Sequence, residues 1–417
     1  MERLVIRGGR ELFGELTVKA AKNSVLPLIA CSILSREDVV LKNVPKLSDI
    51  THMLDIVKSI GGKAEFDGQD IYINCKEANS VLIESNLTGA LRSSIFMLGP
   101  ILSRFRFASI GLPGGCAIGE RPIDLHLAGL EALGVKVCEE NGYVQCDGSQ
   151  IRGGTVSLRF PSVGATENII MAATLGRKQT VIYNAAQEPE ILDLQNFINS
   201  LGGKVSGAGT DTVTVEGVEK LHGGTYRPFT DRIVAASYLA VVAAAKGNII
   251  IKDTAPESFS AVLEVFSCVG CDVTVGNDYV QLVSRKRLAA VAGLETRPYP
   301  GLPTDMQAQI TAMLSMADGE STMVENVFEN RFKYVEQLRT MGADITLNGC
   351  RAVIRGVKQL YGANVSAEDL RGGAALVIAA LSAEGESEIR DIYHIDRGYD
   401  RIEDTLLLFG ADVKRVT

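Results

Sequence analysis

The feature that most constrains the fold is a short pattern that recurs six times along the chain. In each copy a helix-like stretch ends in a hydrophobic residue and a glycine, and another hydrophobic residue follows three positions later. The glycines are Gly61, Gly134, Gly202, Gly270, Gly342 and Gly410, so their spacings are 73, 68, 68, 72 and 68 residues. Six repeats of similar length therefore account for the chain, and the fold must repeat with them.

The residues around these glycines indicate what one repeat contains. Each glycine stands where a helix ends and a strand begins, which suits a left-handed C-terminal cap. The helix before the first glycine is amphipathic, with Ile50, Met53, Leu54 and Val57 on one face. A second kind of helix, such as residues 233–245, is apolar all round and belongs in an interior. A repeat therefore reads β-α-β-α-β-β, with one buried and one outer helix, which predicts the α/β (α+β) class.

The last repeat is incomplete, because only seven residues follow Gly410. The N-terminal segment can supply what is missing, since residues 4–14 resemble residues 352–362. A chain of 417 residues predicts two or three domains, and six repeats favour two domains of three. We expect one domain over residues 22–230, and the other over residues 1–21 plus 231–417.

Composition narrows the class of protein. Lys plus Arg is 42 and Asp plus Glu is 50, and the resulting net charge of −8 argues against general binding to nucleic acid or an anionic membrane. The apolar run 233–245 is too short to span a bilayer. Eight scattered cysteines do not suggest a disulfide framework, and the first residues do not resemble a signal peptide. We therefore expect a cytoplasmic protein.

Polar and charged residues recur at or just before the starts of the apolar helices. A helix N-terminus has free N–H groups and the positive end of the helix dipole, so it attracts anions. Arginines there oppose the dipole, and an anionic ligand explains them better than helix stability does. Aspartates there are good capping residues, so we interpret each of them first as a cap. The set comprises Lys22, Asn23, Arg92, Ser162, Asp231, Arg232, Asp305, Asp369 and Arg371.

A loop rich in Gly and Pro, about residues 111–122, interrupts the second repeat and could close over a site. Cys116 lies in its middle among glycines rather than in an apolar core, and Arg121 would favour its thiolate. We therefore interpret Cys116 as a functional residue. His126 follows without a second ligand at metal spacing, which favours a structural role or a contact at a helix start.

Cys268 and Cys271 have the spacing of a redox pair. Gly270 between them is a repeat glycine, however, so Cys271 begins a strand. This placement favours core packing over redox or zinc chemistry, and a second pair at zinc-binding spacing is absent from the sequence.

Eight motifs spread from end to end carry a family resemblance. They are Lys22-Asn23, Leu91-Arg92-Ser93-Ser94, residues 113–126, Ser162-Val163-Gly164-Ala165-Thr166, Pro303-Thr304-Asp305, residues 327–332, Asp369-Leu370-Arg371 and residues 393–399. Together they make the chain similar to the UDP-N-acetylglucosamine 1-carboxyvinyltransferases of the EPSP synthase, or enolpyruvyl transferase, superfamily. Two places depart from the pattern: Ala21 replaces a common Gly, and Phe160-Pro161 replaces a stretch that contains Lys in some members.

The resemblance implies a fold and a reaction. The fold is a two-domain inside-out α/β barrel with buried central helices. The reaction transfers the enolpyruvyl group of phosphoenolpyruvate to the 3-hydroxyl of UDP-N-acetylglucosamine and releases phosphate by addition and elimination, the first committed step of peptidoglycan synthesis. It needs no metal or other cofactor. We expect no nucleic-acid or membrane partner, and a monomer or weak homo-oligomer.

The resemblance also assigns roles to residues. Asp305 would be the base at the sugar hydroxyl, and Cys116 the acid at the methylene carbon and the target of fosfomycin; Lys22 and Arg397 complete the catalytic set. Phosphoenolpyruvate would be bound by Lys22, Asn23, Arg121, Arg371 and Arg397. UDP-N-acetylglucosamine would be bound by Arg92, Arg121, Pro122, Ile123, Asp124, Leu125, Ser162, Val163, Asp305 and Val327. Arg232, Arg331 and Asp369 would support these groups.

Two alternatives remain. The sister enolpyruvyl transferase acts on shikimate 3-phosphate and shares the fold, but the cysteine loop and residues 121–125 speak against it. A non-catalytic paralogue with a regulatory or scaffold role is the other, and the intact set of Cys116, Asp305, Lys22 and Arg397 argues against that interpretation.

Overall fold

The computed structural model describes residues 2–114 and 123–417. Contacts divide the described residues into two compact units. The middle unit comprises residues 20–114 and 123–229, and the terminal unit comprises residues 2–19 and 230–417. Each unit is described by itself.

The middle unit is built from three repeats, each with an interior and an outer helix. The interior helices are α1 (Lys22–Cys31), α4 (Leu98–Phe105) and α6 (Val163–Thr174), and the outer helices are α2 (Ser48–Ser59), α5 (Asp124–Ala132) and α7 (Pro189–Ser200). Shorter helices are η1 (Ser32–Leu34), α3 (Ser85–Ala90) and η2 (Arg92–Met97). The strands are β3 (Val39–Leu41), β4 (Lys63–Asp67), β5 (Asp70–Asn74), β6 (Leu82–Ile83), β7 (Phe107–Gly111), β8 (Lys136–Glu140), β9 (Tyr143–Asp147), β10 (Gly154–Ser157), β11 (Thr180–Tyr183), β12 (Lys204–Ser206), β13 (Thr212–Glu216) and β14 (Gly224–Tyr226).

The terminal unit repeats this plan. Its interior helices are α8 (Arg232–Ala245), α10 (Gln307–Leu314) and α12 (Leu370–Ser382), and its outer helices are α9 (Ser260–Cys268), α11 (Val335–Thr340) and α13 (Ile402–Leu408). Short 3-10 helices are η3 (Pro256–Phe259), η4 (Thr304–Met306) and η5 (Ile392–Arg397). The strands are β1 (Arg3–Arg7), β2 (Leu12–Thr17), β15 (Gly247–Lys252), β16 (Asp272–Val275), β17 (Tyr279–Ser284), β18 (Leu294–Glu295), β19 (Glu320–Val324), β20 (Asp344–Asn348), β21 (Arg351–Arg355), β22 (Asn364–Ser366), β23 (Glu386–Arg390) and β24 (Asp412–Val416).

Every sheet of the described residues is assembled by one rule. The middle-unit orders are β14-β3-β5-β4, β6-β7-β9-β8 and β10-β11-β13-β12, and the terminal-unit orders are β16-β17-β15-β2, β18-β19-β21-β20 and β22-β23-β1-β24. In each sheet one edge strand is parallel to its neighbour and comes from another repeat, as β10 does beside β11 and β2 beside β15. The repeats of a unit are thus tied together by strand pairing as well as by the helical core.

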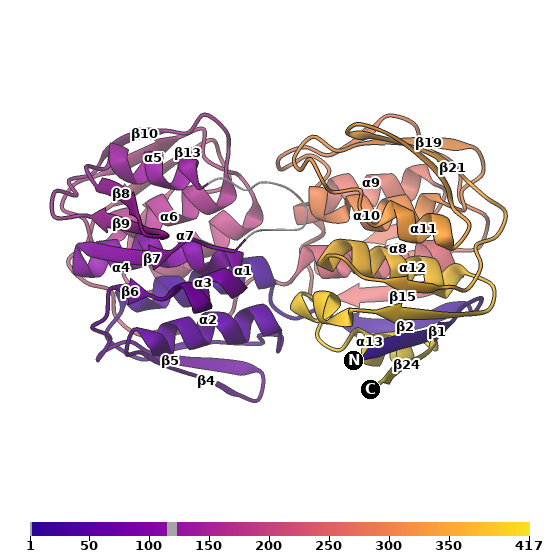
Figure 1. The fold of residues 1–417 in the computed structure, drawn as a ribbon, viewed down its shortest axis with the longest axis horizontal. Coiled ribbons are helices and arrows are strands. Elements are labelled where there is room, and N and C mark those ends of the chain that lie inside the picture. Colours follow the sequence, from indigo (N-terminus) through magenta and orange to yellow (C-terminus); the bar gives the residue numbers. More distant parts are fainter. Residues whose placement is uncertain (1, 115–122) are drawn as a thin grey trace. The chain divides into compact units, whose positions relative to one another are not determined.

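The first and last strands of the chain lie side by side. β1 is antiparallel to both β23 and β24, with Leu4 opposite Ile389 on one side and Arg415 on the other (Figure 1). β2 then leaves this sheet and pairs with β15 in the next one. The N-terminal segment therefore belongs to two sheets of the terminal unit.

The repeat glycines have the conformation that the sequence predicts. All six have a positive φ, between 86° and 96°. The helix before each of them ends two residues earlier, and a strand begins after it, as in α2 and β4 around Gly61. This left-handed conformation strains any residue with a side chain, which explains why the pattern is visible in the sequence.

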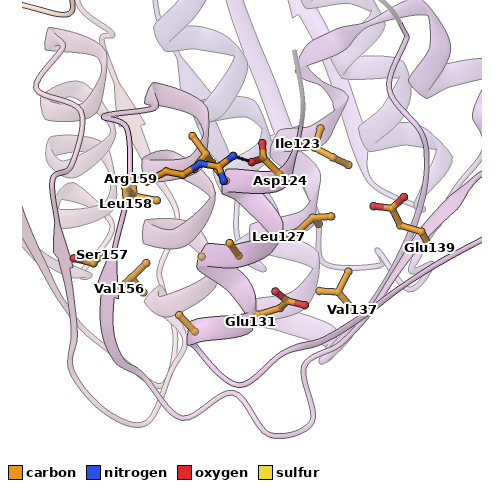
Figure 2. Close-up of a pocket in the computed structure, with 14 residues that line it drawn as sticks. Ile123, Asp124, Leu127, Glu131, Val137, Glu139, Val156, Ser157, Leu158 and Arg159 are labelled. Carbon is orange, nitrogen blue, oxygen red and sulfur yellow. Dashed lines mark hydrogen bonds and ion pairs between the residues drawn. The ribbon is translucent and has the colours of Figure 1, made fainter. Parts of the chain in front are cut away.

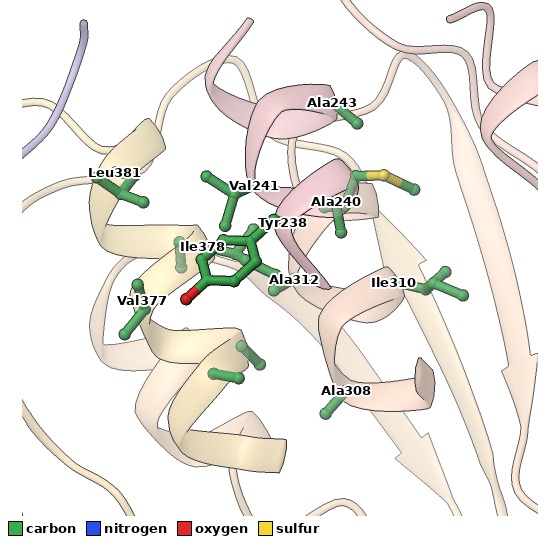
Figure 3. Packing of buried hydrophobic residues seen from close by; sticks show 14 of the residues in the cluster. Tyr238, Ala240, Val241, Ala243, Ala308, Ile310, Ala312, Val377, Ile378 and Leu381 are labelled. Atoms are coloured by element: carbon green, nitrogen blue, oxygen red, sulfur yellow. The ribbon is translucent and has the colours of Figure 1, made fainter. Parts of the chain in front are cut away.

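The interior helices pack against one another because they have no polar face. In the terminal unit α8, α10 and α12 are in mutual contact, and in Figure 3 Tyr238 of α8 lies beside Val377 and Ile378 of α12. Tyr238 is 3% exposed and meets Tyr399 edge to face, with ring centroids 6.3 Å apart. In Figure 1 the strands of this unit lie on either side of these helices. Helices inside and sheets outside confirm the inside-out α/β architecture.

Candidate active site

The carboxylate of Asp305 is held in place by hydrogen bonds from two arginines. Its Oδ1 accepts a hydrogen bond from Arg331 Nη2 at 2.9 Å, and its Oδ2 accepts one from Arg371 Nη2 at 2.8 Å. Both arginines are buried, whereas the Asp305 side chain is 26% exposed. Two guanidinium groups favour the ionised carboxylate, and the exposed part of that carboxylate can reach a ligand.

The interpretation of Asp305 as a helix cap is wrong. It is the middle residue of η4, whose cap position is Pro303, and its side chain does not cap the helix. Charge-assisted bonds to two arginines are stronger than a bond to a backbone N–H, so the carboxylate turns towards them.

Arg371 lies at the centre of a polar network among the interior helices. Its Nη1 donates to the Tyr399 hydroxyl at 3.5 Å, and that hydroxyl lies 2.7 Å from the Ser237 hydroxyl. Gln309 Nε2 donates to the same Ser237 hydroxyl at 3.1 Å. Burial alone would lower the pKa of Arg371, but Asp305 and other neighbours raise it above its usual value. Arg371 is therefore a fixed cation that links α8, α10 and α12.

The other predicted caps are confirmed. Asp231 accepts hydrogen bonds from the N–H groups of Ile233 and Val234, both at 2.9 Å. Asp369 does the same for Arg371 and Gly372, at 2.9 and 3.0 Å. Their charges offset the arginines in the first turns of α8 and α12.

Three further candidates of the terminal unit lie near helix ends or turns. Arg232 is the first residue of α8, with its guanidinium 5.6 Å from the centre of the Tyr299 ring. Arg397 is the last residue of η5. Val327 follows β19, and its N–H donates to Glu325 Oε1 at 2.8 Å.

In the middle unit, Lys22 is the first residue of α1 and is 9% exposed. Its Nζ lies 3.0 Å from Asp49 Oδ2 in the first turn of α2, and Asp49 is 3% exposed. A cation at a helix N-terminus opposes the helix dipole, and Asp49 offsets this repulsion. Asn23, next to Lys22, is exposed to solvent.

A groove of about 700 Å³ runs along α5 in the middle unit. Ile123, Asp124 and Leu125 line one end of it, and β8 and β10 contribute its sides (Figure 2). Asp124 forms a close ion pair with Arg159, which lies between β10 and α6. Three residues predicted to bind the sugar nucleotide are therefore brought together at one hollow.

Two more candidates begin helices of the middle unit. Ser162 caps α6, since its Oγ accepts from the N–H of Ala165 at 3.4 Å, and Val163 is the first residue of that helix. Arg92 begins η2, so it opens a 3-10 helix and not the α-helix that we expected. The α-helix, α4, starts only at Leu98.

Sequence reasoning missed the partners of these residues. Asp49 lies far along the chain from its partner Lys22, and Arg159 lies far from its partner Asp124. Such pairs cannot be recognised from a single sequence. Phe160-Pro161 departs from the family pattern, and Arg159 directly precedes it. This neighbouring cation was the signal in the sequence that could have indicated a partner for Asp124. Cys116, Arg121 and Pro122 lie outside the described residues. Within residues 2–114 and 123–417 there is no cluster of three His, Cys, Asp or Glu side chains suited to a metal ion.

The family model for EPSP synthase (3-phosphoshikimate 1-carboxyvinyltransferase) matches residues 6–406, and the chain belongs to this family. Curated relatives refine this class. The chain is 48% identical over 416 residues to UDP-N-acetylglucosamine 1-carboxyvinyltransferase 2 of Caldanaerobacter subterraneus subsp. tengcongensis, with 100% of both proteins covered. It is 44% identical over 419 residues to UDP-N-acetylglucosamine 1-carboxyvinyltransferase of Coxiella burnetii, covering 100% of this chain and 96% of the relative.

Solved structures support the fold. The enolpyruvyl transferase NikO from Streptomyces tendae matches with a TM-score of 0.89 at 21% identity, covering 100% of this chain and 99% of that one. EPSP synthase from Acinetobacter baumannii matches with a TM-score of 0.78 at 15% identity, with both chains fully covered. In the part of the chain that the structure describes, every helix is too short or too polar to cross a membrane.

Proposed function

We propose that this protein transfers the enolpyruvyl group of phosphoenolpyruvate to the 3-hydroxyl of UDP-N-acetylglucosamine and releases phosphate, the first committed step of peptidoglycan synthesis. The observation that carries this proposal is the match at 44–48% identity, over the whole chain, to relatives named for this reaction. The EPSP synthase structures from Acinetobacter baumannii share only 15% identity with this chain and support the fold alone.

The proposed chemistry has two steps. The hydroxyl oxygen adds to the central carbon of phosphoenolpyruvate, its proton goes to a base, and the methylene carbon takes a proton from an acid. The resulting methyl group then loses a proton as the bond to phosphate breaks, and the double bond is restored. We assign the base to Asp305 and the acid to Cys116.

Asp305 fits the role of base because two arginines orient its carboxylate, which remains 26% exposed. Each oxygen of a carboxylate can accept two hydrogen bonds, so a substrate hydroxyl can still bind beside Arg331 and Arg371. The same arginines hold the carboxylate in place to receive the hydroxyl proton as the new bond forms.

Phosphoenolpyruvate carries a phosphate and a carboxylate, and we assign these to Lys22, Asn23, Arg121, Arg371 and Arg397. Lys22 and Arg371 have acidic partners that hold them in place before substrate arrives. Fixed cations of this kind stabilise charge without first having to reorganise.

We assign the sugar nucleotide to Arg92, Ser162, Val163, Asp305 and Val327 and to residues 121–125. The groove along α5 supports this assignment, because Ile123, Asp124 and Leu125 line it. Arg159, ion-paired with Asp124, supplies a cation beside Phe160-Pro161. Arg232, Arg331 and Asp369 would position these groups rather than bind substrate.

We also propose the setting in which the protein works. Phosphoenolpyruvate and a sugar nucleotide are too highly charged to cross a membrane unaided, which supports a cytoplasmic location, where both are made. We further propose a monomer or weak homo-oligomer whose two domains span residues 22–230 and residues 1–21 plus 231–417.

The reaction is tested by phosphate release from phosphoenolpyruvate, with UDP-N-acetylglucosamine and with shikimate 3-phosphate as separate acceptors. Release with the sugar nucleotide alone would support the proposal. Release only with shikimate 3-phosphate would overturn the acceptor, and release with neither from folded protein would favour a non-catalytic role.

Fosfomycin is expected to add to Cys116 alone, giving one adduct per chain by mass spectrometry of the intact protein and its peptides. Burial raises the pKa of the Cys75 and Cys271 thiols to about 11 and that of Cys146 to about 12, so these remain protonated and unreactive at neutral pH.

The exposed thiols of Cys138, Cys268 and Cys350 are internal controls for this experiment. A general thiol reagent such as iodoacetamide should label all three. An adduct of fosfomycin on any of them, or on no cysteine at all, would contradict the assignment of Cys116.

A further inference from the structure

Arg415 in β24 is a cation to which the proposed reaction assigns no role, and it binds three carboxylates. Its Nη1 and Nη2 donate hydrogen bonds to the two oxygens of Asp396 at 2.9 and 2.7 Å. Its Nε and Nη2 donate to the two oxygens of Glu403 at 2.7 and 3.0 Å. Nη1 also donates to Glu2 Oε2 at 2.9 Å. A guanidinium has five N–H groups, so these five bonds use every donor of Arg415.

The members of this cluster belong to elements that pack together in the terminal unit. Asp396 lies in η5, Glu403 lies in α13, and Glu2 directly precedes β1. β24 pairs with β1 and packs against α13 (Figure 1). The side chain of Arg415 is 16% exposed. Because paired hydrogen bonds from one guanidinium to one carboxylate fix the geometry of both groups, Arg415 anchors η5 to the last strand of the chain.

The anchored carboxylate is next to a candidate substrate-binding residue. Arg397, which we assign to phosphoenolpyruvate, directly follows Asp396 and is the last residue of η5. The carbonyl of Ile395, a fully buried residue, accepts hydrogen bonds from the N–H groups of Gly398 and Tyr399, both at 3.0 Å. The backbone that carries Arg397 is therefore held by this turn and, at Asp396, by the paired bonds from Arg415.

The cluster also determines where the negative charge of Asp396 is directed. Both of its oxygens are bound by Arg415. A carboxylate released from Arg415 would be one residue away from Arg397, and opposite charges at such short separation attract each other. It would then compete with the phosphate and carboxylate of a substrate for the Arg397 guanidinium.

We propose that Arg415 positions Arg397 for phosphoenolpyruvate by holding the carboxylate of Asp396. This inference rests on the proposed function, which assigns Arg397 to that substrate. Arg415 acts through Asp396 and is a positioning residue, not a catalytic one. UDP-N-acetylglucosamine is assigned to other residues, so the effect of Arg415 should be selective for phosphoenolpyruvate.

Arg415→Lys in the full chain tests the proposal because it keeps the charge and removes the planar fork. An ammonium group cannot bind both oxygens of Asp396 and of Glu403 as a guanidinium does. The KM for phosphoenolpyruvate should rise about tenfold, the size expected when one hydrogen bond to a charged group is lost. The change in kcat should be smaller. The Kd for UDP-N-acetylglucosamine, measured by calorimetry, should change less than about twofold.

Asp396→Asn is the second variant, and it probes the same pair from the other side. It should also raise the KM for phosphoenolpyruvate. The double variant with Arg415→Lys should be no worse than the more affected single variant, because the two side chains act as one unit. Asp396 is more exposed than Glu403, so its substitution disturbs the packing less and remains informative if Arg415→Lys does not fold.

Glu403→Gln is the matched control, since Glu403 is the other carboxylate that Arg415 binds with two bonds but is not adjacent to Arg397. It should lower the unfolding temperature and leave the KM for phosphoenolpyruvate unchanged. An equal rise of this KM in Glu403→Gln would indicate a merely structural cluster and overturn the inference. So would an unchanged KM in both Arg415→Lys and Asp396→Asn. If the folded, unmodified protein released no phosphate with UDP-N-acetylglucosamine, the proposed function would fall first, and this inference with it.

Discussion

Asp305→Asn should lower turnover about a thousandfold while changing the affinity for UDP-N-acetylglucosamine less than about threefold. The amide has the shape of the carboxylate and can still contact the substrate hydroxyl. It cannot take up the hydroxyl proton as a carboxylate does, so the loss should be confined to the chemical step. Single-turnover kinetics and calorimetric titration of the sugar nucleotide measure the two quantities separately.

The variant must first be shown to fold, because it leaves Arg331 and Arg371 beside a neutral group. These arginines are 3% and 4% exposed, and a buried cation without its partner costs about 3–5 kcal/mol. Asp344→Asn is the matched control, because Asp344 is an exposed aspartate 3.8 Å from Arg355. Equal losses of turnover and affinity in Asp305→Asn would instead make Asp305 a binding residue.

Gly247→Ala should lower the free energy of unfolding of the terminal unit by about 4 kcal/mol or more. Gly247 opens β15 with a φ of 130°, directly opposite Leu12 of β2. A Cβ atom there would lie 1.9 Å from the Leu12 carbonyl oxygen, which is backbone and cannot turn away. The pairing of β15 with β2 must therefore break or shift, and hydrogen exchange should become faster in both strands.

Gly270→Ala separates this clash from ordinary backbone strain. Gly270 also has a positive φ, 94°, but a Cβ added there meets nothing within 4 Å. Its substitution should cost only about 1 kcal/mol. Calorimetry measures the free energy of unfolding of both variants. An equal loss for Gly247→Ala and Gly270→Ala would contradict the importance of the contact between Gly247 and Leu12.

The sequence predicts much of the fold because several of its constraints are local. A positive φ after a helix admits few residues other than glycine, so Gly61 and its five counterparts mark the repeats. Interior helices such as α8 are recognisable because a helix without a polar face has no stable place at the surface. The sequence does not reveal that each sheet takes its parallel edge strand from another repeat, because the pairing of β10 with β11 depends on packing between repeats.

The candidate site is less accessible to sequence reasoning for the same reason. Asp305 has the residue type of a cap, and only the folded chain brings Arg331 and Arg371, 26 and 66 residues away, to its oxygens. Asn168 lies in a helix that reads as apolar core. Its side chain bonds the Gly99 N–H, the Ile95 carbonyl and the His126 ring, and the sequence connects none of these residues to it.

The place of β1 between β23 and β24 has a consequence for how the protein is made. Among the described strands, β1 leaves the ribosome first and β24 last, so the first strand must wait for the last one before its sheet is complete. The middle unit has all its strands once residue 229 has emerged, and it can fold while the rest is still being synthesised. The terminal unit is therefore completed only when β24 is available. Until then β1 lacks one of its two neighbouring strands, although β2 can already pair with β15.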